Sequence, residues 1–291
     1  ASPAGLAAAE AVIGVLWNRL RAGLGSTVTG PVALCVGAAG ATAAGEAAAG
    51  LADRLCQLSS IGSVAVCSDV VIAHAGALGG QRGITLVAGT GAVAFGIDGR
   101  GATIQVDGWG PLLGDDGGGG WIGLAGLRAA LRMHDGRGPG TSLGAAASLL
   151  AEPAALPALL AGHPNPAQLA ARFAPEVARL AGAGDQVAQS IMVEAARLLA
   201  ESVSAAARRL AADGGALPVP VALTGGLLNL GPILLEPLQQ ALRTGPLPVL
   251  LRPPLAGPLD GARLLAGRHD TVAEALLHRA TRPAPSAAGS G

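Results

Sequence analysis

Lysine is missing from this 291-residue chain, in which all 19 basic residues are arginine. A Walker A loop, the nucleotide-binding lysine of protein kinases and a pyridoxal Schiff base each need a lysine amine, so all three are excluded. Acidic residues also number 19, which makes the formal net charge zero. Because such a chain has no net field to attract nucleic acid or an anionic membrane surface, we expect neither as a partner.

Cysteine is scarce, and the three cysteines lie far apart. Cys35, Cys56 and Cys67 form no C-x-x-C pair and have no histidine at ligand spacing. This pattern predicts neither a zinc site nor an iron–sulfur site, and favours small buried side chains in a reducing cytoplasm. The first ten residues lack the basic region and apolar core of a signal peptide, so a cytoplasmic location is expected.

Unbroken apolar runs of membrane-spanning length are also lacking. The uncharged stretches 22–45 and 214–235 are long enough to span a bilayer, but glycine and proline interrupt both. We therefore expect buried strand-and-turn units there. With 51% hydrophobic and 13% charged residues, the chain is too apolar to be disordered and should form a soluble globular protein.

Strand and helix patterns alternate along the chain, which predicts an α/β fold with a parallel sheet. Strands are expected at 32–36, 64–67, 84–88, 93–97, 219–223 and 248–251. Helices are expected at 4–24, 45–58, 120–133, throughout 143–210, at 232–243 and from 260.

The most distinctive segment is the glycine-rich stretch 107–123, DGWGPLLGDDGGGGWIG. Its adjacent carboxylates, Asp115 and Asp116, lie among glycines that allow a ligand or another part of the chain to approach the backbone closely. A flexible linker is the simpler explanation, but Trp109 and Trp121 near its two ends favour a structured loop.

Two shorter glycine motifs each follow an apolar strand. In Gly89-Thr90-Gly91, the backbone N–H groups and the threonine hydroxyl could face a phosphate or a sugar oxygen. A hairpin turn without any ligand would have the same sequence. Thr224-Gly225-Gly226 leaves the same two interpretations open.

Asp69 follows the second predicted strand, at the strand end where open α/β sheets bind their ligands. It could equally cap the next helix, and both roles stay open. His74 is expected on the surface of that helix. Asp135 and Arg137 are expected to brace the turn after the helix at 120–133.

Taken in order, these pieces resemble the N-acetylglucosamine kinase and activator-type ATPase family. Its members carry a strand-end Asp, then G-T-G, then a G-G-W-G…G-D-E-G loop, then a late T/S-G-G. The matching stretches are C-S-D at 67–69, V-A-G-T-G at 87–91, D-G-W-G at 107–110, L-G-D-D-G at 113–117, L-T-G-G at 223–226 and P-L-D-G-A at 258–262. The resemblance covers nearly the whole chain.

The resemblance implies a two-lobed ribonuclease H-like fold of the actin/hexokinase ATPase type. Residues 1–80 would form an incomplete N-terminal lobe, with a C-terminal helix at 261–282 packed back on it. Residues 81–260 would form the sugar and nucleotide lobe, and 283–291 a disordered tail. A homodimer is also suggested.

Roles for single residues follow from the same resemblance. Asp69 would be the general base that takes the proton from the primary hydroxyl of N-acetylglucosamine or glucosamine as it attacks ATP, with Mg²⁺ present. The sugar contacts would be Thr90, Gly91, Gly108, Trp109, Asp115 and Asp116. The nucleotide contacts would be Gly89, Thr90, Gly91, Thr224, Gly225, Gly226 and Gly261.

Two features depart from the family pattern. Asp116 stands where Glu is usual, and the chain starts after the D-G-G-G-T-like hairpin that would wrap the phosphates of ATP. Two alternatives therefore accompany the amino-sugar kinase: a catalytically impaired sugar-binding or regulatory protein, and an activator-type ATPase. The activator needs cysteines that bridge a cluster between subunits, an arrangement that the three cysteines do not show.

Overall fold

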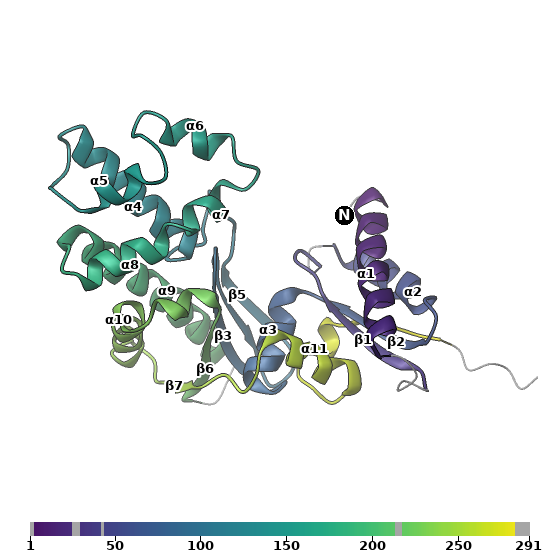
Figure 1. Ribbon diagram of the computed structural model, residues 1–291. Coiled ribbons are helices and arrows are strands. Elements are labelled where there is room, and N and C mark those ends of the chain that lie inside the picture. The colour runs from purple at the N-terminus through teal and green to yellow at the C-terminus, as the bar shows by residue number, and fades with distance from the viewer. Residues whose placement is uncertain (1–2, 25–29, 42–43, 213–216, 283–291) are drawn as a thin grey trace, which may run out of the picture. The chain divides into compact units, whose positions relative to one another are not determined.

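The computed structural model describes residues 3–24, 30–41, 44–212 and 217–282 (Figure 1). The chain divides into two compact units: the first contains residues up to 82, residues 99–101 and those from 254 onward, and the second contains residues 83–98 and 102–253. Within the described ranges, no helix combines the length and the hydropathy needed to cross a bilayer.

The first unit is a three-stranded sheet with helices on its faces. Its strands are β1 (Val32–Gly37), β2 (Ile61–Cys67) and β8 (His278–Thr281), and its helices are α1 (Pro3–Leu24), α2 (Gly45–Cys56), α3 (Asp69–Leu78) and α11 (Pro258–Gly267). β1 and β2 are parallel, and β8 pairs antiparallel with the other edge of β2. The strand–helix–strand unit predicted from the first apolar runs is confirmed.

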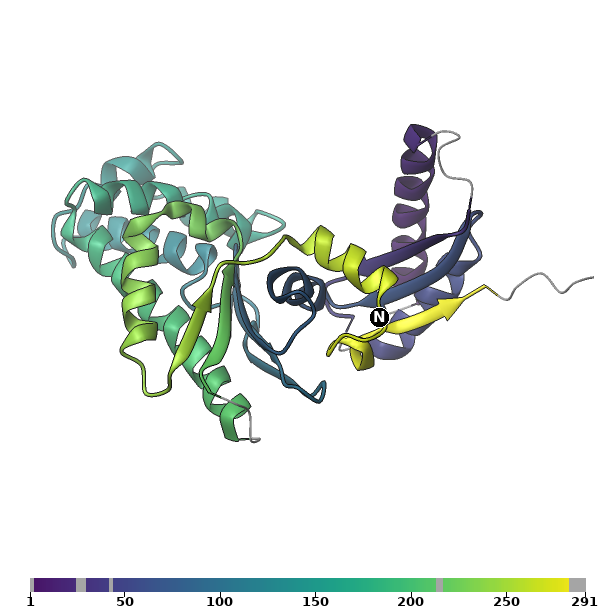
Figure 2. The same ribbon diagram turned by 90° about the horizontal axis from the view of Figure 1, so that it is seen from below.

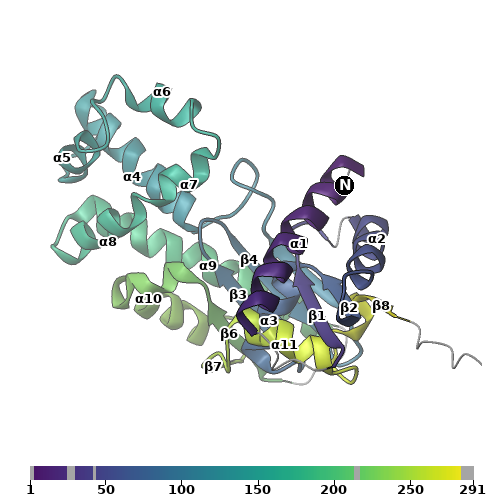
Figure 3. The same ribbon diagram turned by 45° about the vertical axis from the view of Figure 1, so that its right-hand side comes forward.

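Alternation along β2 separates the two faces of this sheet. Val64 and Val66 join a core cluster with the buried Trp17 of α1 and with residues of α2. Ala65 and Cys67 are also buried but point the opposite way, toward the side on which α3 and α11 contact the sheet (Figure 3). Both faces are therefore covered, as expected for parallel strands.

α3 is enclosed on all sides, because every residue from 71 to 78 is buried. The surface position predicted for His74 is wrong, since its side chain is 0% exposed. The reason is tertiary: α11 crosses α3 closely, and a Cβ on Gly261 would collide with the carbonyl oxygen of Ile72. Helical periodicity alone cannot indicate a helix covered from a second direction.

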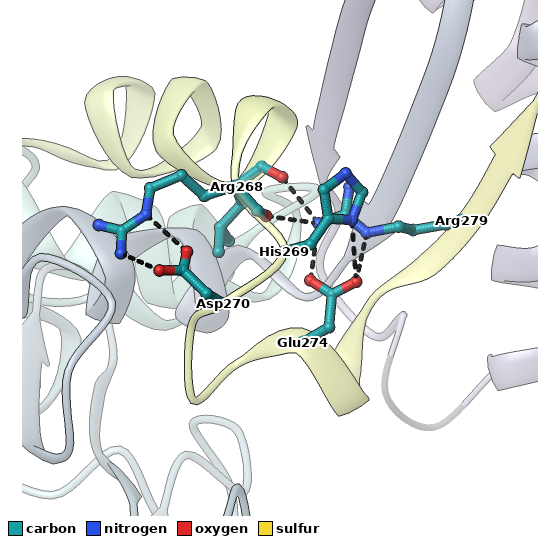
Figure 4. Close-up of polar contacts among 6 residues, drawn as sticks. Arg268, His269, Asp270, Glu274 and Arg279 are labelled. Atoms are coloured by element: carbon teal, nitrogen blue, oxygen red, sulfur yellow. Dashed lines mark hydrogen bonds and ion pairs between the residues drawn. The ribbon is translucent and has the colours of Figure 1, made fainter.

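The C-terminal segment does not form the single helix expected over 261–282. α11 ends at Gly267, a short 3-10 turn (Glu274–Leu276) follows, and the chain then enters β8. Arg279 of β8 explains this path (Figure 4), because its Nε donates to Glu274 at 2.6 Å and its Nη2 donates to the carbonyls of Leu265 and Arg268 at 3.0 and 2.9 Å. The guanidinium satisfies carbonyls at the end of α11 that a continued helix would have used itself.

The second unit is a five-stranded sheet with the strand order β5-β4-β3-β6-β7. Its strands are β3 (Gly83–Ala88), β4 (Ala92–Ile97), β5 (Thr103–Asp107), β6 (Val219–Thr224) and β7 (Val249–Arg252). Its helices are α4 (Gly119–His134), α5 (Leu143–Ser148), α6 (Leu156–Ala161), α7 (Pro166–Ala171), α8 (Ala174–Gly182), α9 (Gln186–Ala212) and α10 (Pro232–Arg243), with a 3-10 turn η3 (Gly226–Leu230). These helices lie on one side of the sheet (Figures 1 and 2).

The 27-residue helix α9 is the main support of this sheet, and it contacts β3, β4, β5 and β6. Met192, Leu199 and Val203 are among its fully buried residues, at the spacing of one helical face. The helical character predicted for 143–210 is confirmed, with Pro157 and Pro166 in the first turns of α6 and α7.

The turn after α4 is braced as predicted. Nε of Arg137 donates to Oδ2 of Asp135 at 3.0 Å, and the side chain of Arg132 donates to the carbonyl of Arg137 at 3.0 Å. Asp135 and Arg137 therefore have a structural explanation, and no catalytic role is needed for them.

Candidate active site

Three of the predicted motifs meet at one end of the sheet in the second unit. β3, β5 and β6 run in the same direction and end at Ala88, Asp107 and Thr224. The G-T-G turn joins β3 to β4, the glycine-rich loop leaves β5, and the T-G-G motif leaves β6. Ligands bind at the carboxyl ends of strands in open α/β sheets, so this edge is the candidate site.

The carboxylate of Asp115 lies directly over the backbone of Gly91. A Cβ built on Gly91 would be 2.6 Å from Cγ and from Oδ2 of Asp115. The N–H of Ala92 points at the same carboxylate, 3.4 Å from Oδ1. Only glycine at 91 leaves this space free, so the G-T-G turn and the acidic loop form one structure.

Asp107 fixes the acidic loop from its starting point. Its Oδ1 accepts the N–H groups of Gly108 and Asp115, both at 2.7 Å, and its Oδ2 accepts the N–H of Asp116 at 2.8 Å. Sequence reasoning quoted Asp107 as the first residue of the loop but gave it no role. An Asp followed by Gly at a strand end is a turn signal that could have indicated one.

Three carboxylates close together change the electrostatics of the loop. Burial raises the pKa of Asp115, and the negative charges of Asp107 and Asp116 raise it further, while the N–H of Ala92 opposes the shift. The pKa of Asp116 is also raised, first by burial and then by the charges of Asp107 and Glu201. Such a site favours ligands that donate hydrogen bonds, as sugar hydroxyls do.

Backbone groups of the G-T-G turn form hydrogen bonds within the protein. The N–H of Gly89 donates to the carbonyl of Gly91 at 2.8 Å, and α4 begins by donating from Gly119 and Gly120 to the carbonyls of Gly89 and Thr90, at 2.8 and 2.7 Å. The hairpin interpretation therefore accounts for Gly89, whereas the Thr90 side chain is exposed. The predicted ligand contacts of this turn stay predictions.

The T-G-G motif lies beside the end of β3. The hydroxyl of Thr224 donates to the carbonyl of Leu86 at 3.1 Å, which ties β6 to β3. Gly225 has a φ of 105°, and a Cβ there would collide with the carbonyl of Ala88. Gly225 and Gly226 are exposed, so they leave bare backbone against which a flat ligand can lie.

The remaining residues predicted for the second unit border the same loop. Gly108 has a φ of 74° and packs beside Val93. Trp109 is 69% exposed, and Asp116 is exposed as well. The structure brings Gly108 and Asp116 to the acidic loop through Asp107, and Trp109 lies on the loop between them.

Two predicted site residues belong to the first unit. Asp69 begins α3 immediately after β2, and its Oδ1 accepts the hydroxyl of Ser68 and the N–H of Val70, both at 3.0 Å. Ser68 occupies the N-cap position but makes no capping bond with its side chain, so Asp69, in the first turn and exposed, takes over part of this structural role through its bond with Val70. Gly261 is buried at the crossing of α3 and α11, and packing alone explains a glycine there.

Among the described residues, no three or more His, Cys, Asp or Glu side chains are placed to hold a metal ion together. These residues therefore do not form a magnesium cage of their own. In phosphoryl-transfer sites generally, Mg²⁺ is held by one or two carboxylates together with substrate phosphates and water.

Fold and site together are those of an α/β protein with a candidate ligand site at the carboxyl edge of a sheet. The family model for BadF/BadG/BcrA/BcrD ATPases matches residues 7–266. The chain belongs to this family, which confirms the resemblance based on the order of the motifs.

Named relatives point in the same direction. The chain is 34% identical over 120 residues to an N-acetylmuramic acid/N-acetylglucosamine kinase of Clostridium acetobutylicum, covering 41% of this chain and 39% of that protein. It is 32% identical over 167 residues to an N-acetyl-D-glucosamine kinase of Dictyostelium discoideum, covering 55% and 51%. The chain thus spans about half the length of these relatives or less.

Two solved structures share the fold. A candidate N-acetylglucosamine kinase from Chromobacterium violaceum aligns with a TM-score of 0.56 and 29% identity, over 70% of this chain and 65% of that one. A second, from Porphyromonas gingivalis, aligns with a TM-score of 0.61 and 20% identity, over 81% and 77%. The predicted α/β fold of the actin/hexokinase ATPase type is confirmed.

Proposed function

We propose that this protein is an ATP-dependent kinase that phosphorylates the primary hydroxyl of N-acetylglucosamine. The observation that carries the proposal is the carboxylate of Asp115, seated on Gly91 at the carboxyl edge of the sheet. The proposal is supported by the membership of the chain in this ATPase family and by relatives that are named N-acetylglucosamine kinases. Glucosamine is the second substrate to be tested.

In this proposal, Asp115 holds the sugar. A carboxylate accepts hydrogen bonds from two adjacent hydroxyls, and its half-buried position beside Gly91 makes those bonds stronger than they would be in water. The exposed glycines of the T-G-G motif, with Thr90 nearby on the adjoining turn, would receive ATP. Catalysis of phosphoryl transfer depends chiefly on such positioning.

Asp69 is the proposed general base. Both of its protein donors contact Oδ1, which leaves Oδ2 to accept the proton of the sugar hydroxyl. As the hydroxyl oxygen forms its bond to the γ-phosphorus, the bond from that phosphorus to the bridging oxygen breaks, and ADP leaves with the electron pair. The products are the sugar phosphate and ADP, and the proton passes through Asp69 to solvent.

The test is sugar-dependent release of ADP by the purified chain, with N-acetylglucosamine, glucosamine, N-acetylmuramic acid and glucose. Asp69→Asn should lower kcat by about 100-fold or more while sugar affinity stays unchanged in calorimetry. Asp53→Asn, at an exposed carboxylate of α2, is the matched control and should keep full activity. Sugar binding without ADP release by the unaltered chain would instead identify a sugar-binding protein.

A further inference from the structure

We propose that Asp107 is a positioning residue, which sets the place of the Asp115 carboxylate and thereby the affinity for the sugar. The proposal rests on the proposed function, because it assumes that Asp115 holds the substrate. It assigns a task to a carboxylate to which the family resemblance gives no role. Asp107 acts through Asp115, not on the sugar itself.

The hydrogen bonds of Asp107 close the loop on itself. Its two oxygens accept one N–H from the next residue and two from residues eight and nine positions further on, at 2.7 to 2.8 Å. A single carboxylate therefore holds both ends of the segment 108–116. Bonds of this kind, from N–H groups to an ionised acceptor, are among the stronger ones in proteins.

Backbone conformation supports the same conclusion. Asp107 and Asp115 both have left-handed backbones, with φ of 63° and 60°. Residues other than glycine adopt this conformation at a cost, and keep it only where their surroundings enforce it. The bond between Oδ1 of Asp107 and the N–H of Asp115 joins these two strained positions directly.

The rest of the loop has little packing that could do this work instead. Trp109, Leu112 and Leu113 are 69%, 95% and 85% exposed. Apolar side chains in contact with water do not fix a backbone, since they gain nothing by holding one position. Apart from Asp107, the described contacts near Asp115 include the long one from the N–H of Ala92, a bond from the N–H of Gly110, and the bonds from Gly119 and Gly120 that tie the start of α4 to the G-T-G turn.

Asp107→Ala and Asp107→Asn test the proposal against Asp185→Asn. Asp185 is a matched control, because its carboxylate also accepts backbone N–H groups, among them those of Ser142 and Ala188, and braces a loop at the start of α9. All three variants should lose similar stability. Only Asp107→Ala should raise the KM for the sugar, by about tenfold or more, with the KM for ATP nearly unchanged.

Asp107→Asn separates positioning from simple bracing. Asparagine keeps the Oδ1 that binds Gly108 and Asp115, so sugar affinity should be largely rescued relative to the alanine variant. It also removes one negative charge beside Asp115, whose other charged neighbour is Asp116, itself next to Glu201 of α9. The acid limb of sugar binding should therefore shift to lower pH, a change that a purely structural role would not produce.

Hydrogen exchange keeps the proposal testable even if the chain proves to have no kinase activity. In the unaltered protein, the amides of Asp115 and Asp116 should be protected, and Asp107→Ala should expose both while the amides of α9 stay protected. If the unaltered chain has no kinase activity, the proposed function is refuted but the positioning role of Asp107 is not. An Asp107→Ala protein with unchanged sugar affinity, or with unchanged protection at 115 and 116, would overturn the positioning role.

Discussion

Alanine at position 91 would place a methyl group against the carboxylate of Asp115, the proposed sugar-binding group. The added Cβ would be 2.6 Å from Cγ and Oδ2 of Asp115 and 2.7 Å from Oδ1, whereas ordinary contact begins at 3.4 Å. The carboxylate must therefore move by about 0.8 Å. Gly99, an exposed turn glycine after β4, offers a control, because a Cβ there meets nothing within 4 Å.

The consequences for stability and for activity should differ. The displaced group is the end of a side chain, so Gly91→Ala should cost only about 1 kcal/mol of folding free energy, the cost of one poor rotamer. A protein group that holds the substrate can reduce turnover by about 100-fold when it is misplaced by roughly 1 Å. Activity should therefore fall far more than stability.

The assay compares kcat/KM for N-acetylglucosamine with the free energy of unfolding in denaturant. Gly91→Ala should lose about 10- to 100-fold in kcat/KM, and Gly99→Ala should remain within about threefold of the unaltered protein. If a folded Gly91→Ala protein keeps its full affinity and turnover, the proposal that Asp115 holds the sugar is refuted.

Three further outcomes are expected. Gly225→Ala should lower the free energy of unfolding by about 1–3 kcal/mol, because φ is 105° and the Cβ collides with backbone, while Gly226→Ala, with open space, should be near neutral in the same denaturation assay. Burial opposes ionisation of Asp185, but the N–H groups of Ala188 and Ser142 and the hydroxyl of Thr141 outweigh burial and lower the pKa of this carboxyl. Its contribution to stability should therefore be present above the unfolded pKa of about 3.9 and fade below it. The free energies of unfolding of Asp185→Asn and of the unaltered protein should converge in acid. A hydrogen bond from Cys67 lowers the pKa of the Cys35 thiol, and the same bond with burial raises that of Cys67; iodoacetamide should therefore label Cys35 first in peptide mass spectra, and faster labelling of Cys67 would contradict this.

Local patterns were sufficient to predict much of the fold. Apolar runs separated by a helical pattern indicated β1, α2 and β2 within a few residues, because buried parallel strands leave a strong hydrophobic signal. β8 left no such signal. Its four residues, HRAT, are held by pairing with β2 and by the contacts of Arg279, which join parts of the chain that are distant in sequence. A local sequence pattern cannot predict strand pairing that depends on such distant contacts.

The candidate site shows the same limit. The order of the motifs indicated Asp115 and Gly91 separately, and the family match confirmed the resemblance drawn from that order. Their direct contact depends on how two strand ends are arranged, which the sequence pattern does not specify. Asp107 was missed because its three hydrogen bonds span a loop that its own position in the sequence does not reveal.

Trp109 has a practical consequence for anyone who studies this loop. The chain contains no tyrosine and only three tryptophans, so its intrinsic fluorescence comes from very few positions. Trp17 is buried and donates its indole N–H to Ser59, whereas Trp109 is 69% exposed between the two acidic ends of the loop. Acrylamide should quench Trp109 preferentially, and a molecule that settles beside Asp115 should alter that emission. The protein thus supplies an optical reporter at its own candidate site, with no dye attached.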